Sequence, residues 1–65
     1  MCLLKVYLDE GGGRRLLAED VALVVKEAGG LKLIGLELSN GVVAEGVEVS
    51  RIDTLNAIMI VKPKK

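Results

Sequence analysis

The sequence predicts a small β-barrel of short strands, closed or partly open, and three observations lead to this prediction. The apolar residues fall into short runs, several of which alternate with polar ones as in a half-buried strand. Eight glycines cluster between those runs, where they indicate tight corners. A chain of 65 residues forms one small domain, and closing its sheet would protect the strand edges.

Residues 2–8 show the alternation most clearly. Leu4, Val6 and Leu8 share one face with the cysteine at position 2, while the residues between them face the other way. Three consecutive glycines in residues 9–13 then predict a turn, because such a run is unfavourable in any regular element.

Residues 14–28 are ambiguous on local grounds. Leu17, Val21 and Ala28 follow the spacing of an amphipathic helix that stops at Gly29-Gly30. The alternation around Val25 also fits the first arm of a hairpin. Local propensity slightly favours the helix.

The second half of the chain reads as further strands separated by turns. Asn40-Gly41 is a strong hairpin signal, because both residues tolerate a positive φ. The expected elements are a strand at residues 31–38 with a bulge or bend at Gly35, a strand at 42–52 with a bend at Gly46, a turn at 54–56 and a strand at 57–61. We therefore expect a single domain over residues 1–62 and a frayed basic tail over residues 63–65.

The size and composition of the chain predict a homodimer. A core this small supplies only about 3–5 kcal/mol, and a single cysteine rules out an intrachain disulfide. Apolar residues make up 51% of the chain, so an uncovered apolar patch would suit a twofold partner. We expect the first strand to lie in that interface.

The charge distribution makes RNA binding the alternative function and not the leading one. The nine basic and nine acidic side chains cancel, with a mildly acidic body and a basic end. The residues that could contact phosphates are Arg14, Arg15, Lys62, Lys64 and Lys65. Single-strand recognition usually needs stacking aromatics, and Tyr7 is the sole aromatic residue.

Most catalytic chemistry is excluded, and we expect no enzyme activity. The chain lacks histidine, and one cysteine cannot form a CxxC motif or a thiolate cluster for zinc. No apolar stretch is long enough for a transmembrane helix, and the start does not resemble a signal peptide. We therefore expect a cytoplasmic protein without membrane contact.

Cys2 has the side chain with the most useful chemistry in this sequence, although a free cysteine in a protein is often only a small buried apolar residue. The Met1 amine, the Cys2 amide nitrogen and the Cys2 sulfur can close two fused five-membered chelate rings. Such planar nitrogen and sulfur donors suit square-planar Ni(II), and they suit Cu(II) as well. One chain supplies two or three donors, so a stable site needs Cys2 of a second chain.

The start MCLLKVYL resembles the CooT family, whose short prokaryotic members begin Met-Cys. The family includes a nickel-binding accessory protein of carbon monoxide dehydrogenase maturation, and some members carry the label "predicted RNA-binding protein". The likeness continues through Glu19-Asp20-Val21, the segment from Gly46 to Asp53, and the run from Ala57 to Val61.

This resemblance implies an all-β barrel of about six to seven short antiparallel strands, similar in size to Sm and SH3 domains. It recasts residues 14–28 as strands, since tertiary pairing routinely overrides helix propensity. It also implies a homodimer that binds Ni(II) between the two Cys2 thiolates, with the Met1 amine as a further ligand. The expected role is that of a metallochaperone, which stores, buffers or delivers nickel to a nickel enzyme or its maturation factors.

Overall fold

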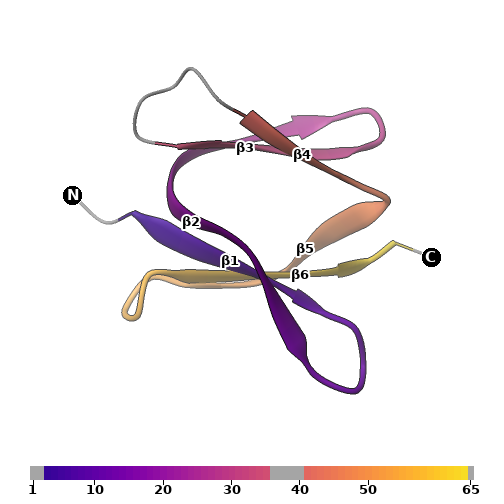
Figure 1. Cartoon of the computed structure of the whole chain (residues 1–65), viewed down its shortest axis with the longest axis horizontal. Helices are drawn as coiled ribbons and strands as arrows, with labels where there is room; N and C mark the ends of the chain where they lie inside the picture. Colours follow the sequence, from indigo (N-terminus) through magenta and orange to yellow (C-terminus); the bar gives the residue numbers. More distant parts are fainter. Residues whose placement is uncertain (1–2, 36–40, 65) are drawn as a thin grey trace.

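The computed structural model describes residues 3–35 and 41–64, and Figure 1 shows their arrangement. Six strands form one sheet in the order β4-β3-β2-β1-β6-β5. Their bounds are β1 Leu4–Asp9, β2 Arg14–Glu27, β3 Gly30–Gly35, β4 Gly41–Glu45, β5 Val47–Asp53 and β6 Ile58–Pro63. The all-β prediction is confirmed, and the described residues contain no helix that could cross a membrane.

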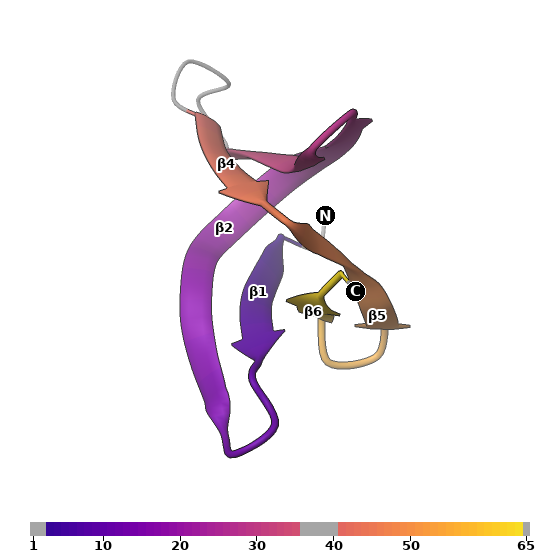
Figure 2. The ribbon, with the colours of Figure 1, turned by 90° about the vertical axis from the view of Figure 1, so that its right-hand side faces the viewer.

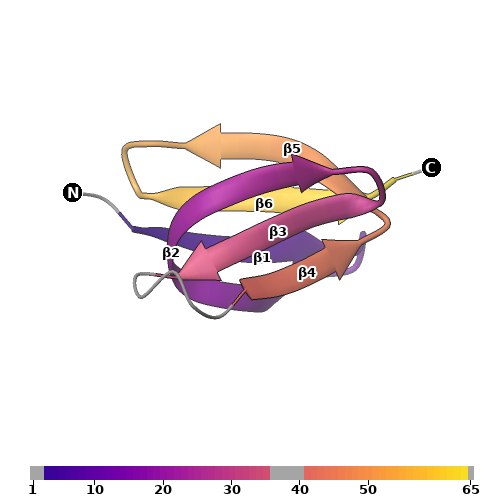
Figure 3. The ribbon, with the colours of Figure 1, turned by 90° about the horizontal axis from the view of Figure 1, so that it is seen from above.

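The sheet curls into a partly open barrel. Its two edge strands, β4 and β5, are joined directly through Gly46, whose φ of 71° turns the chain sharply at the predicted bend. The segment predicted as one strand over residues 42–52 is therefore two strands at opposite edges of the sheet. Figure 3 shows β5 and β4 on opposite sides of the barrel, meeting at this corner.

Pairing is mixed rather than antiparallel throughout, which corrects the predicted arrangement. β1 and β6 run parallel, with Val6 opposite Met59 and Leu8 opposite Val61. All other neighbouring strands are antiparallel. The parallel pair joins the two ends of the chain, a non-local contact that no hairpin signal reports.

β2 shows why residues 14–28 carried a helix-like pattern. Its first half pairs with β1 and its second half with β3, so the strand bends between two partners, as Figure 2 shows. Every irregularity in these pairings places an extra residue in β2, and Asp20 at the bend has a φ of 54°. The bulges break the strict alternation of a strand, so the local preference for a helix was wrong.

The core lies between the curled halves of the sheet. The central strands supply most of it, because each is covered on its inner face by the opposite half. Val6 and Val61 are fully buried, and Met59 and Leu33 are 1% and 2% exposed. Val6 and Leu8 point inward as the alternation in residues 2–8 predicted.

The end of the chain is tied to the barrel in the described residues. β6 runs through Pro63, and the Lys64 amide donates a 2.8 Å hydrogen bond to the Gly46 carbonyl. Lys65 lies outside the described residues, so the boundary between residues 62 and 63 stays a prediction.

Candidate metal centre

The predicted ligands Met1 and Cys2 lie outside the described residues, but the segment that follows them is well defined. Leu3 leads into β1 at Leu4, and β1 is an inner strand, paired with β2 on one side and β6 on the other. Buried Val6 and Leu8 anchor it further. The chain therefore begins next to a firmly held strand, at one end of the barrel.

That end also carries the turn between β5 and β6. The Lys5 amide donates a 3.0 Å hydrogen bond to the Ala57 carbonyl, which places residues 54–57 beside the start of β1. Leu55 in this turn is 90% exposed. This exposed leucine provides apolar surface beside the start of β1.

Asp53 holds this turn in shape, as the predicted turn at residues 54–56 requires. Its Oδ1 accepts hydrogen bonds from the backbone amides of Leu55 and Asn56, at 3.0 and 3.1 Å. Its Oδ2 accepts a hydrogen bond from the Asn56 side-chain amide at 3.0 Å. These bonds, led by the Asn56 side chain, lower the pKa of the Asp53 carboxyl below its usual value. Both oxygens of the Asp53 carboxylate therefore accept hydrogen bonds within the turn.

Within residues 3–35 and 41–64, no three Cys, Asp or Glu side chains gather into a possible metal-binding group. The metal prediction therefore depends on Met1 and Cys2 alone, as the sequence analysis proposed. Their placement stays a prediction.

The four described basic residues of the RNA alternative, Arg14, Arg15, Lys62 and Lys64, are exposed and lie close to acidic residues. In the strand register, Arg14 of β2 lies opposite Asp9 of β1, and Lys62 of β6 lies opposite Glu48 of β5. Arg15 forms a 3.3 Å ion pair with Glu10.

Lys64, just beyond β6, lines a cavity together with Glu48. A polyanion favours an unbroken basic surface, and these acids interrupt it. RNA binding stays a prediction, and Lys65 lies outside the described residues.

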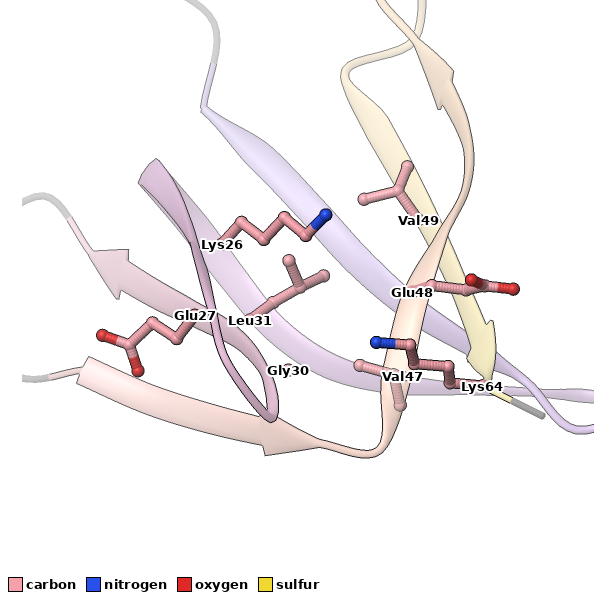
Figure 4. A pocket seen from close by; sticks show the side chains of 8 residues that line it. All are labelled: Lys26, Glu27, Gly30, Leu31, Val47, Glu48, Val49 and Lys64. Atoms are coloured by element: carbon pink, nitrogen blue, oxygen red, sulfur yellow. The ribbon is translucent and has the colours of Figure 1, made fainter.

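The sequence analysis did not predict a groove in the wall of the barrel. This groove follows the open seam, which is the gap between β5 and the second half of β2. A cavity of about 320 Å³ lies at the Gly46 end of the seam, between the β2–β3 turn and β5. Figure 4 shows the side chains that line it. The cavity is lined by Lys26, Glu27, Gly30, Leu31, Val47, Glu48, Val49 and Lys64. These residues come from four separate segments, so no motif or spacing in the sequence could have revealed the cavity.

Comparison with known proteins agrees with the resemblance seen in the sequence. A family model described as CO dehydrogenase accessory protein CooT matches residues 1–62. A solved structure of a protein provisionally named CooT from Carboxydothermus hydrogenoformans superposes with a TM-score of 0.86. The match covers 98% of this chain and all of that one at 16% identity, which shows the same fold. No match was found among curated proteins.

Proposed function

Because the chain belongs to the CooT family of CO dehydrogenase accessory proteins, we propose that it is a non-enzymatic nickel-binding protein. It stores, buffers or delivers Ni(II) through Cys2 in a homodimer. The observation that carries this proposal is that the family match includes the Met-Cys start, which holds the single cysteine of the chain. The recipient is a nickel enzyme or one of its maturation factors.

The donor set suits this cargo. A Cys2 thiolate and the adjacent backbone nitrogen close a five-membered chelate ring, and the Met1 amine closes a second. Nitrogen and thiolate donors in one plane match square-planar Ni(II). Two symmetry-related copies that each contribute the Cys2 thiolate and one nitrogen fill the four positions of a square plane, which links metal loading to dimer formation.

The fold supports a dimer through the end of the barrel at which the chain begins. Both edges of β1 are already paired, so this strand can contribute to an interface only through its start and its faces. Exposed Leu55 lies in the turn beside that start, where its burial would favour association. A twofold axis at this end would bring the two Cys2 residues together.

Loading and release follow from proton competition. The Cys2 thiol must lose its proton to bind the metal, and so must the Cys2 amide nitrogen or the Met1 ammonium group where it is a ligand, so binding releases protons and weakens as the pH falls. A thiol group or imidazole on the recipient can then take over the ion. Such transfer needs no catalytic group on this chain, which agrees with an accessory role.

Titration of Ni(II) into the wild-type chain and into Cys2→Ser tests the proposal. We expect thiolate-to-metal charge-transfer absorption that saturates at one ion per dimer in the wild type and is absent in the variant. Equal, weak responses from both proteins would refute it. A parallel Cu(II) titration measures selectivity, because most sites prefer copper.

The role of Met1 needs its own variant. A chain of this length can be made by chemical synthesis with an acetylated N-terminus, which removes the amine as a donor. We expect weaker binding and a shifted absorption band. An unchanged spectrum would leave Cys2 as the ligand and remove Met1 from the site.

A further inference from the structure

The cavity at the Gly46 end of the seam continues into a second one. This second cavity, of about 450 Å³, runs along the seam toward the start of β1. Lys26, Leu31 and Val49 line both cavities, so together they form one groove. Each volume lies within the range of about 300–1,000 Å³ that is usual for small-molecule sites.

Charge is separated in the first cavity. Figure 4 shows the ammonium groups of Lys26 and Lys64 pointing into it from opposite walls. The carboxylates of Glu27 and Glu48 point away from it. An anion in the cavity would meet two positive groups, although the four charges of the lining cancel.

The rest of the groove is apolar. Leu31 is 5% exposed and forms part of the wall beneath the lysines, together with buried Val47. The second cavity is lined mainly by aliphatic side chains, among them Leu4, Val21, Leu23, Val49 and Ile52, with Lys26 at the side shared with the first. An apolar chain whose head group sits at the charged end would lie in continuous apolar contact along the second cavity.

The charged end of the groove is closed by backbone hydrogen bonds. The Gly46 amide donates to the Gly29 carbonyl and the Lys64 amide to the Gly46 carbonyl, each at 2.8 Å. These bonds join the β2–β3 turn, the β4–β5 corner and the end of β6. A ligand must therefore end there, which fits a terminal head group better than a peptide that passes through.

We propose that this groove binds an aliphatic carboxylate, with the carboxylate between Lys26 and Lys64 and the hydrocarbon chain along the second cavity. Two ammonium groups can each donate to one carboxylate oxygen. Phosphate would gain little from the apolar wall, and the lining offers no arginine to bind it in two-pronged fashion. The groove therefore selects a single negative charge on an apolar chain.

The head-group end of this site lies apart from the proposed nickel site, and the second cavity reaches Leu4 at the start of β1. The charged cavity is lined by Lys64 just beyond β6, whereas Figure 1 shows β1 beginning at the opposite end of the barrel. A variant without Cys2 should keep the groove. The two proposals can thus fail separately.

Calorimetric titration of the full chain with acetate, hexanoate and octanoate tests the proposal. We expect octanoate to bind about tenfold more tightly than hexanoate, because each buried methylene contributes about 0.8 kcal/mol at most. Acetate should bind too weakly to detect. Equal affinity for all three acids, or equal binding of octanoate and octanol, would overturn the proposal.

Matched charge variants locate the head group. Lys26→Gln and Lys64→Gln should each weaken octanoate binding about fivefold, as expected for a solvent-exposed charge contact. Lys62→Gln removes the same charge from an exposed residue of β6 outside the groove and should have no effect.

Equal losses in all three variants would show a general effect of charge and refute the site. Inorganic phosphate that competes as well as octanoate would refute it too. Tighter binding of an acetylated peptide with one glutamate among valines would reassign the groove to an acidic peptide.

Discussion

Asp53 accepts hydrogen bonds from both the backbone and the side-chain amide of Asn56, at 3.1 and 3.0 Å. This double contact shapes the turn that lies beside the start of β1. It also favours the charged carboxylate in the folded state, because the charged form is the better acceptor.

Asp53 therefore makes folding stability depend on acidity. A lowered pKa in the folded state means that the contribution is present above the unfolded pKa of about 3.9 and is lost as the pH falls through the folded pKa. We expect the difference in unfolding free energy between wild type and Asp53→Asn to shrink below about pH 4. Urea titrations between pH 2.5 and 6 measure it.

Glu48→Gln removes a carboxylate from the same strand and serves as the control for Asp53→Asn. Its difference from wild type should not follow that pattern. A constant difference for Asp53→Asn over the whole range would contradict the assigned role of the carboxylate.

Ala57 holds a left-handed conformation, with a φ of 57°, in the same turn. A β-carbon is unfavourable there by about 1–2 kcal/mol, which exceeds the entropy that glycine adds to the unfolded chain. Ala57→Gly should therefore raise the unfolding free energy by about 0.5–1 kcal/mol. Ala22→Gly, in exposed β2, should lower it. Thermal melts that show both variants destabilised would contradict the strain at Ala57.

Gly30 is placed so closely against β4 that no side chain fits. A β-carbon there would collide with the Ala44 carbonyl and lie 2.9 Å from the Glu45 α-carbon, both of them backbone atoms. Gly30→Ala should cost about 1–3 kcal/mol of stability, because the pairing of β3 and β4 must shift. Gly29→Ala, with open space around the new methyl group, is the matched control and should change little. Equal midpoints in denaturant would refute the contact.

Leu55 tests the proposed dimer without touching the metal ligands. Leu55→Asp should shift the protein toward monomer and weaken nickel binding, because a charge would be buried in the interface. Leu16→Asp is the control, since Leu16 is also an exposed leucine, 43% accessible, but lies near the other end of β1.

Light scattering after size exclusion measures the mass of both variants. A wild-type monomer, or a dimer that only Leu16→Asp disrupts, would contradict an interface at the chain start. Nickel uptake by a monomeric wild type would separate the metal proposal from the dimer proposal.

Local patterns were enough to place several elements of this protein. The alternation in residues 2–8 identified the inward face of β1, and Gly46 marked the corner between β4 and β5. The Met-Cys start, together with the segments that follow it, indicated the family, and the family model confirms it. Each of these features depends on neighbours in the chain, so the sequence by itself determined them.

Other features were decided by contacts between distant segments. β2 is a strand because β1 and β3 pair with its two halves, and its bulges hide the alternation that would have revealed this. The parallel pairing of β1 with β6 joins the two ends of the chain. Lys26 and Lys64 face one cavity only because the sheet curls. Pairing and closure draw their free energy from burial across the whole barrel, which no local stretch of sequence contains.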